Sequence, residues 1–336
     1  MSSQEISPLL FFDTVNSFQR TEALKSAIEL ELFTAIGEGN RTAAEIAARI
    51  GARERGVRIL CDYLTVIGFM TKDANAYALT PDSEMFLDRR SPAYVGGAVE
   101  FLLSPMLTEG FKTLTEAVRR GGTAISGEGS LAPEHPVWVN FARGMAPLVM
   151  MAAQMMTTLV EVEAERKFRV LDIAAGHGMF GITFAQRYPN AEIVALDWPN
   201  VLEVARENAE RAGVGDRHTL LPGSAFDVDF GDGYDLVLLT NFLHHFDPPT
   251  CETLLRKVYA ALKDGGRAMT LEFVPDETRV APPIAAMFSL VMLASTPGGD
   301  AYTFSELERM FQNAGFSQSE LIPLPPMPNQ IVLSHK

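Results

Sequence analysis

Residues 170–181 read VLDIAAGHGMFG, and the pattern around this stretch decides the fold of the second half of the chain. An apolar run contains Asp172 near its end, and a turn with Gly176, Gly178 and Gly181 leads into a helical pattern. A strand, a glycine turn and a helix begin a parallel α/β unit, in which the backbone of the turn can approach a ligand closely. The glycine spacing fits G-x-G-x-x-G, which is a weak signal when it stands alone.

Apolar strand patterns alternate with amphipathic helix patterns from Phe168 to the end of the chain. Such alternation predicts an α/β fold with a mainly parallel, doubly wound, Rossmann-like sheet and a ligand site at the carboxyl ends of its strands. The expected helices cover 179–189, 200–213, 249–266 and 303–316. The expected strands cover 168–175, 191–197, 217–223, 267–274 and 329–336, with a further strand that runs into a loop over 234–246.

The first half of the chain has helical spacing and one hairpin pattern. A long helix is expected over 8–36, and Thr42 with Glu45 forms a capping-box pattern that begins a second helix. A third helix is expected over 55–70, and 71–83 has the alternation and turn residues of a hairpin. Helices followed by a hairpin form a winged-helix pattern, which can bind DNA or pack between subunits.

The charge of the chain bears on that choice. The 336 residues carry a net charge of −14, which repels phosphate backbones and anionic lipid heads. We therefore favour subunit packing over DNA contact, and we expect neither a nucleic-acid nor a membrane partner. An uncharged stretch over 280–299 contains three prolines, so it predicts a helix beside a pocket rather than a membrane span. Two widely separated cysteines and the lack of a signal-peptide pattern predict a cytoplasmic protein.

Charged residues cluster over 161–167, between the helical and the alternating patterns. Because the length of the chain suits two domains, we expect a mainly helical winged-helix domain over 1–160 and an α/β domain over 161–336. The helical pattern over 91–160 is rich in methionine near its end. Flexible methionine side chains are typical of a buried helix face and also of an adaptable apolar pocket.

The glycine turn is compatible with two kinds of cofactor. A dinucleotide would place its pyrophosphate on the turn, and Asp197, at the end of the next strand, would bind a ribose. S-Adenosylmethionine contains no phosphate and carries an ammonium and a sulfonium group. The carboxylate of Asp172 would repel a pyrophosphate and attract these cations. We therefore favour S-adenosylmethionine, and an NAD-dependent oxidoreductase is the alternative.

A pair of histidines, His244 and His245, follows the strand that begins at 234. Adjacent side chains of an extended segment point to opposite sides, so one histidine is expected to face a ligand. A neutral imidazole there could take a proton from a phenol or an enol, and Glu272 on the next strand could orient it. The six histidines are scattered without the spacing of a metal site, so no metal is expected.

Six motifs together carry a family resemblance: LDIAAGHG at 171–178, ALDWPNVLEVA at 195–205, FLHHFD at 242–247, ALKDGGR at 261–267, LEFVPD at 271–276 and TPGGDAYTFSELERMFQNAGF at 296–316. With them the chain resembles the class I O-methyltransferases that have an N-terminal winged-helix dimerisation domain, namely the caffeate- and hydroxyindole-type enzymes and bacterial polyketide-tailoring relatives. The resemblance implies S-adenosylmethionine as cofactor and a homodimer formed through domain 1–160. It also implies methyl transfer to a hydroxyl oxygen of a small aromatic or polyketide-like acceptor.

The resemblance also implies roles for individual residues. His244 falls on the general base and Glu272 on its partner acid. Phe11 and Phe12 fall on a first helix that, in relatives, reaches the partner's pocket. The implied cofactor contacts are Asp172, Gly176, Gly178, Asp197, Ser224 and Phe226, and the implied substrate contacts are Phe141, Met145, Met292 and Thr296.

The chain departs from the family pattern at three places. Ser224 and Ala225 precede Phe226 where many relatives have Asp and Met. Ala301 occupies the position of a second flanking glutamate, and His245 replaces an Asp or Asn. The acceptor therefore need not be a simple phenol, and methylation of nitrogen or carbon is an alternative. A winged-helix regulator with a ligand-sensing α/β domain is the non-enzymatic alternative.

Overall fold

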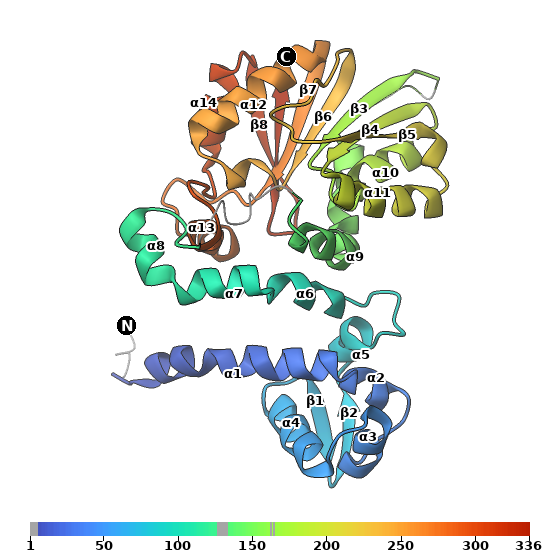
Figure 1. Ribbon diagram of the computed structural model, residues 1–336, viewed down its shortest axis with the longest axis vertical. Coiled ribbons are helices and arrows are strands. Elements are labelled where there is room, and N and C mark those ends of the chain that lie inside the picture. The colour runs from blue at the N-terminus through green and yellow to red at the C-terminus, as the bar shows by residue number, and fades with distance from the viewer. Residues whose placement is uncertain (1–5, 126–133, 162, 164) are drawn as a thin grey trace. The chain divides into compact units, whose positions relative to one another are not determined.

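The computed structural model describes residues 6–125, 134–161, 163 and 165–336, and the chain forms two compact units, Met1–Val99 and Glu100–Lys336 (Figure 1). This division differs from the boundary that we expected at 161–167, where residues 162 and 164 lie outside the described part. Residues 100–160 belong to the second unit because α9 (Val137–Thr158) packs on α10 (Met179–Arg187) and α11 (Pro199–Arg211).

The first unit has the helices and the hairpin of the expected winged-helix pattern. The capping box is confirmed, because Thr42 Oγ1 accepts from the N–H of Glu45 and the Glu45 carboxylate accepts from the N–H of Thr42. The single helix over 8–36 is wrong: the chain breaks at Glu31, which has a φ of 54°. Its elements are α1 (Leu9–Glu29), α2 (Leu32–Gly37), α3 (Ala43–Ile50), α4 (Glu54–Val66), β1 (Met70–Asp73), β2 (Ala76–Leu79), α5 (Pro81–Leu87) and η1 (Gly96–Ala98).

The first unit leaves the first half of its longest helix without an apolar covering of its own. The buried core lies between α2, α3, α4 and the hairpin, and Tyr77 from β2 is among its largest buried side chains. The first half of α1, in contrast, exposes Phe11, Phe12, Val15 and Phe18. A contiguous exposed apolar surface of this kind marks a contact site for another molecule.

The second unit contains a seven-stranded sheet in the order β5-β4-β3-β6-β7-β9-β8. The first five strands of this order are parallel, and β9 runs antiparallel to both of its neighbours. The predicted doubly wound α/β fold is therefore confirmed. The strands are β3 (Phe168–Ile173), β4 (Ala191–Asp197), β5 (His218–Pro222), β6 (Tyr234–Thr240), β7 (Leu262–Glu272), β8 (Gln318–Pro323) and β9 (Gln330–His335).

Two details of this sheet differ from the sequence-based expectation. The helix expected over 249–266 ends at Ala261, because Leu262 adopts an extended conformation and pairs with Tyr234 of β6. Strand β8 has no counterpart among the expected strands. It is an edge strand whose pattern is partly polar, and the hydroxyls of Ser319 and Ser334 form a hydrogen bond across it.

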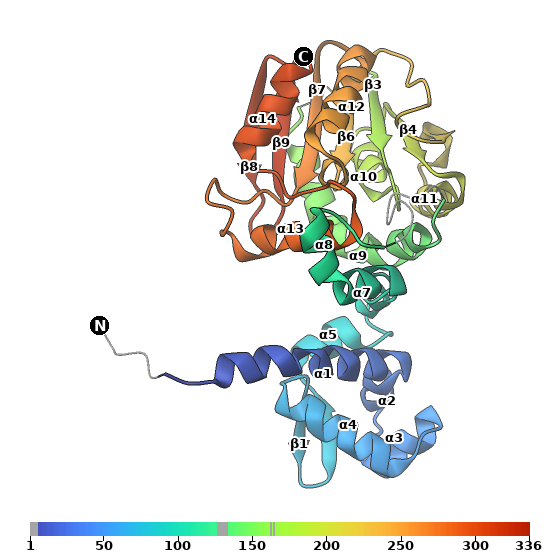
Figure 2. The same cartoon turned by 60° about the vertical axis from the view of Figure 1, so that its left-hand side comes forward.

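Helices cover both faces of the sheet (Figures 1 and 2). One buried cluster joins α12 (Pro248–Ala261) and α14 (Phe304–Asn313) to Val237 and Leu239, and another joins α9 and α10 to Leu236 and Leu238. Alternate residues of β6 thus enter opposite cores, as expected for a sheet buried on both faces. The remaining helices are α6 (Val99–Leu102), α7 (Pro105–Lys112), α8 (Leu114–Arg120) and α13 (Pro283–Ser295) with the short η3 (Gly215–Arg217) and η4 (Leu243–His245). Across the described residues no helix has the length and apolarity that a membrane span requires.

Candidate active site

A cavity of about 870 Å³ lies at the carboxyl ends of the parallel strands in the second unit. Ala174 follows β3, Asp197 ends β4, Thr240 ends β6 and Leu271 lies at the end of β7, and all four line the cavity. Helices α7, α9 and α13 and the segments around 223–227, 241–246 and 327–329 contribute much of the rest of a wall that is mostly apolar and aromatic. The position is the one expected for a ligand site in a doubly wound sheet.

The glycine turn and Asp197 meet at one side of this cavity. The N–H of Gly176 donates to Asp197 Oδ2 over 2.8 Å, and the N–H of Trp198 donates to Asp197 Oδ1 over 2.7 Å. Gly176 has a φ of 57°, a conformation that glycine adopts without strain. Burial raises the pKa of the Asp197 carboxyl to about 6. The turn and the acid therefore form one rigid surface with acceptor oxygens at the cavity.

Asp172 lies behind the turn and does not line the cavity. Its side chain is fully buried, and Asp172 Oδ2 accepts from the N–H of Gly181 in α10 over 3.1 Å. Gly178 is also absent from the cavity wall, and a Cβ at this position would lie 3.0 Å from Ala205 Cβ on α11. The expectation that Asp172 faces the cofactor is therefore corrected: the acid fixes the start of α10, and Gly178 lets α10 approach α11.

The buried acid leads to a testable pH dependence. Burial raises the pKa of Asp172 to about 7, and its Oδ1 has no hydrogen-bond partner in the described part of the chain. The unfolded carboxyl titrates near pH 4, so the folded state holds the proton longer and loses stability as the pH rises from about 4 to about 7. Asp172→Asn keeps an acceptor for the N–H of Gly181 without this charge.

We expect the stability advantage of Asp172→Asn over the native protein to grow by about 1–3 kcal/mol between pH 5 and pH 8. Urea unfolding of the ligand-free protein at both pH values measures this difference. A difference that stays constant with pH would show that the carboxyl titrates normally in the folded state.

His244 and Glu272 form a buried pair at the other side of the cavity. His244 Nδ1 lies 2.5 Å from Glu272 Oε2, and the two side chains are 6% and 4% exposed. Glu272 Oε1 accepts from the N–H of Leu243 over 2.9 Å and from the N–H of Phe242 over 3.1 Å. One carboxylate therefore fixes both the turn η4 and the ring that the turn carries. Because an ionised carboxylate only accepts hydrogen bonds, it places the ring proton on Nδ1 and leaves the lone pair on Nε2.

His245 also lines the cavity, so the expectation that only one histidine faces a ligand is wrong. The reason is local: the segment forms a 3₁₀ turn rather than an extended strand, and the centroids of the two rings lie 4.4 Å apart. Burial, with a smaller contribution from His244, lowers the pKa of His245 well below its usual value. His245 Nδ1 is buried and has no hydrogen-bond partner among the residues that the structure describes.

Comparisons with known proteins agree with this geometry. A family model of the O-methyltransferase domain matches residues 111–317, and a model of the O-methyltransferase dimerisation domain matches residues 12–89. The chain belongs to the O-methyltransferase family. The enzyme is thus an S-adenosylmethionine-dependent O-methyltransferase, and the predicted cofactor and enzyme class are confirmed.

Individual relatives cover this O-methyltransferase nearly from end to end. The 3-hydroxy-5-methyl-1-naphthoate 3-O-methyltransferase of Streptomyces sahachiroi is 27% identical over 314 residues, which are 93% of this chain and 90% of that protein. A crystal structure from Nostoc punctiforme PCC 73102, assigned to the O-methyltransferases, is 56% identical with a TM-score of 0.95 and covers 99% of this chain and 100% of the other. Human N-acetylserotonin methyltransferase in complex with SAM shares the fold, with a TM-score of 0.87 at 22% identity over 100% and 99% of the two chains.

Three of the four expected substrate contacts of the methyltransferase line the cavity: Phe141 and Met145 from α9 and Met292 from α13. Thr296 does not. Its hydroxyl donates to the carbonyl of Met292 over 2.8 Å and accepts from the N–H of Gly299 over 2.9 Å, so it stabilises the end of α13. Ser295 lines the cavity instead. The lining residue is therefore the direct neighbour of the residue that the resemblance implied.

Several aromatic residues of the cavity had no signal in the sequence. The ring of Phe288 lies edge-on to His244 with centroids 4.8 Å apart, and it stacks on Phe273 at 4.2 Å. Trp138 from α9 lies edge-on to His245 at 5.4 Å. These contacts join α9, α13 and the end of β7, which are far apart in the sequence, so only the tertiary structure reveals them.

The expected contacts Ser224 and Phe226 line the cavity in the segment that follows β5. Lys257 from α12 supports this segment, because its Nζ donates to the carbonyls of Ala225, Phe226 and Val228 over 2.8, 2.8 and 3.0 Å. One ammonium thus satisfies three backbone acceptors behind the cavity wall. The sequence gives no indication of this support, since Lys257 occupies an ordinary position in an amphipathic helix.

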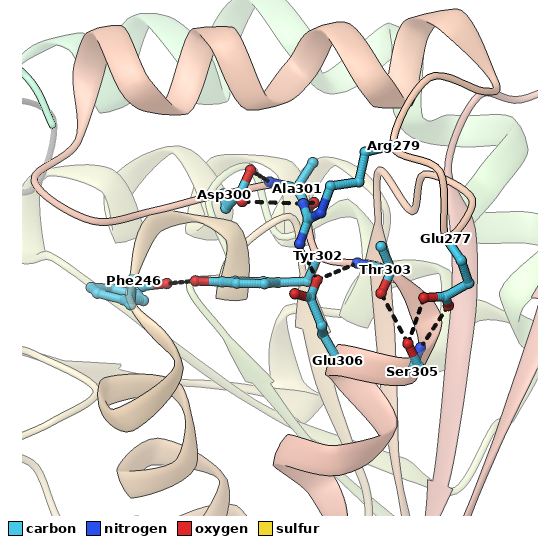
Figure 3. A network of polar contacts seen from close by, with 9 residues as sticks. All are labelled: Phe246, Glu277, Arg279, Asp300, Ala301, Tyr302, Thr303, Ser305 and Glu306. Carbon is cyan, nitrogen blue, oxygen red and sulfur yellow. Dashed lines mark hydrogen bonds and ion pairs between the residues drawn. The ribbon is translucent and has the colours of Figure 1, made fainter. Parts of the chain in front are cut away.

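In the methyltransferase, the acid beside Ala301 takes part in a network of polar contacts with Arg279 (Figure 3). Ala301 is fully buried, and the neighbouring Asp300 accepts from Arg279 over 3.2 Å at a half-exposed position. Arg279 also pairs with Glu306, and the hydroxyl of Tyr302 donates to the carbonyl of Phe246. Asp300 therefore pairs with Arg279, whereas Glu272 contacts His244.

Metal-ligating side chains do not gather in the part of the methyltransferase that the structure describes. Over residues 6–125, 134–161, 163 and 165–336, no group of three or more His, Cys, Asp or Glu residues has the geometry to hold a metal ion. The buried pair of His244 and Glu272 has the geometry of a base and an orienting acid.

Proposed function

We propose that the enzyme transfers a methyl group from S-adenosylmethionine to a hydroxyl oxygen of a small aromatic or polyketide-like acceptor, with His244 as the general base. The observation that carries the proposal is the 2.5 Å contact between His244 Nδ1 and Glu272 Oε2 at the wall of the cavity. This contact leaves Nε2 free to accept a proton. A hydroxyl group is a poor nucleophile until its proton is removed, which is the step that such a base performs.

Each residue of the proposed site has one task. S-Adenosylmethionine supplies a methyl group that is activated by a positively charged sulfur. His244 takes the proton of the acceptor hydroxyl at Nε2, and Glu272 stabilises the imidazolium that forms. Phe141, Met145 and Met292 surround the acceptor with apolar surface and exclude water. Positioning of the two reactants and base action together account for catalysis.

The cofactor side of the cavity fits a group without phosphate. Asp197 offers acceptor oxygens for ribose hydroxyls, Gly176 offers bare backbone, and Ser224 and Phe226 line the adenine side in our proposal. Among the described residues that line the cavity, none is lysine or arginine, and a pyrophosphate would therefore meet Asp197 without a neutralising side chain. Asp172 and Gly178 act from behind by holding the turn in shape.

The names of two relatives support oxygen as the methylated atom, and the name of a third supports carbon. The naphthoate relative is a 3-O-methyltransferase by name, and the tetracenomycin relative from Streptomyces glaucescens is an 8-O-methyl transferase. An L-tyrosine C(3)-methyltransferase from Streptomyces lavendulae is also 27% identical to this chain. The substitution of Ala301 for a second acid keeps carbon or nitrogen methylation as the alternative.

A ligand comparison tests the proposed cofactor site. At about 100 times its Kd, S-adenosylhomocysteine is expected to stabilise the folded protein by about 2.7 kcal/mol, which raises the melting temperature by several degrees. The same concentration of NAD is expected to cause no shift. A shift with NAD and none with S-adenosylhomocysteine would support the oxidoreductase instead.

The enzyme is proposed to act as a homodimer through its first unit. The dimerisation-domain model matches residues 12–89, and the first half of α1 exposes Phe11, Phe12 and Phe18. Phe11 and Phe12 are proposed to reach the partner subunit's cavity. Sedimentation of the full chain measures this state, and a monomeric mass at micromolar concentration would contradict it.

The two buried free thiols, Cys61 and Cys251, suit a reducing cytoplasm.

A further inference from the structure

The ionisable side chains among the described residues that line the cavity are acids and histidines. Four ionisable residues line it, namely Asp197, Asp227, His244 and His245, and no lysine or arginine is found among the lining residues that the structure describes. In the sequence, no lysine or arginine occurs at residues 1–19, 126–133, 162 or 164 either. The first helix, which includes Phe11 and Phe12, therefore begins without a cation.

Three cations that are near cavity-lining residues, in sequence or by direct contact, are engaged elsewhere. Arg143, between the lining residues Phe141 and Met145, donates to Glu207 over 3.3 and 3.4 Å. Lys112 donates to Glu109 over 2.6 Å, and Lys257 donates to three backbone carbonyls behind the wall. A rearrangement that brought one of them into the cavity would break these contacts.

The two histidines do not supply the missing positive charge. Burial lowers the pKa of His245, so its ring is neutral at physiological pH. His244 Nδ1 lies 2.5 Å from Glu272 Oε2, so this ring is already paired with an acid. An acceptor that enters this cavity meets hydrogen-bonding groups and aromatic rings of the protein, and the described lining side chains offer it no lysine or arginine.

Resting on the proposed function, we propose that the acceptor is an uncharged hydroxyaromatic molecule and that the cavity selects against analogues with a carboxylate or phosphate group. A carboxylate that leaves water for an apolar cavity requires a paired cation or several donors to offset its desolvation. The net charge of −14 adds repulsion during the approach of an anion. The preference sets this chain apart from the naphthoate relative, whose named substrate carries a carboxylate.

A matched pair of ligands tests the proposal without relying on turnover. The probes are 3-hydroxy-1-naphthoic acid and its methyl ester, which differ by one negative charge at pH 8. Calorimetry on the full chain saturated with S-adenosylhomocysteine gives a Kd for each. We expect the ester to bind roughly 30-fold more tightly or better. Equal affinity, or tighter binding of the acid, would overturn the proposal.

A charge introduced into the wall provides the second test. Met106 lines the cavity from α7 and has no part in the proposed chemistry. Met106→Lys is expected to tighten binding of the acid about 10-fold relative to the ester, and Met106→Gln, the uncharged control, is expected to leave the ratio unchanged. An equal change of the ratio in both variants would overturn the explanation by charge.

The measurements separate this inference from the proposed function. If the ester is preferred and neither ligand is methylated when S-adenosylmethionine is supplied, the inference stands and the proposed reaction fails. If the ester is methylated and the acid binds equally well, the proposed reaction stands and the inference fails.

Discussion

Replacing His244 with alanine is expected to lower kcat by roughly two orders of magnitude or more, because general-base catalysis by a positioned imidazole contributes about that factor. The acceptor hydroxyl would lose the group that takes its proton, while Asp197 and the glycine turn on the cofactor side stay in place. The measurement is methyl transfer to a verified acceptor under saturating S-adenosylmethionine, compared with the native protein at the same pH.

Two controls make the result for His244→Ala interpretable. The thermal shift with S-adenosylhomocysteine should persist, which shows that the fold and the cofactor site are intact. His245→Ala truncates the neighbouring ring of the same turn and keeps the contact between His244 and Glu272, so a smaller loss is expected. Native turnover in His244→Ala would refute the base role, and equal losses in the two variants would assign the effect to the turn.

Glu272→Gln is the second variant with a large expected effect, a loss of kcat of about 10²–10⁴-fold. The carboxylate accepts hydrogen bonds from His244 Nδ1 and from the backbone N–H groups of Phe242, Leu243 and His244. A glutamine has one acceptor oxygen and one amide donor. If its oxygen serves the backbone, its amide faces His244 Nδ1 and favours the tautomer with the proton on Nε2, which cannot act as a base.

The same variant distinguishes tautomer control from simple loss of structure. Glutamine preserves the size of the side chain, so the melting temperature should fall much less than activity. Glu272→Ala removes the acceptor for both the turn and the ring, and it should lower stability by about 3 kcal/mol or more as well as activity. A Glu272→Gln enzyme with near-native kcat would show that Glu272 does not set the protonation of His244.

Local sequence patterns predicted most of the elements that position the site. The apolar run before Gly176 and the alternation after Phe168 correspond to β3 and its successive strands and helices, because burial on both faces of a parallel sheet imposes that pattern on each strand. The ends of adjacent strands also predicted that His244 and Glu272 meet. Their 2.5 Å contact confirms the geometry, and the roles remain proposals.

Predictions that depended on the direction of a side chain were less accurate. Asp172 points away from the cavity to the start of α10, so the cavity wall without lysine or arginine among its described residues, and not this acid, disfavours a dinucleotide. Thr296 turns back to α13, and His245 turns into the cavity because η4 is a 3₁₀ turn. A shift of one residue along the chain changes which side chain faces the cavity. Packing against neighbouring helices and strands sets that direction.

The amino-acid sequence by itself determined the α/β class of the second half, the capped helices and hairpin of the first half, the family and the two strand ends that carry His244 and Glu272. Only the tertiary structure decided that 100–160 belongs with the sheet, that Lys257 supports the wall near Phe226, and that the cavity contains no lysine or arginine among its described lining residues. The reason is physical. Periodicity and turn chemistry act between residues a few positions apart, whereas the charge and shape of a cavity are set by side chains that meet from distant parts of the chain.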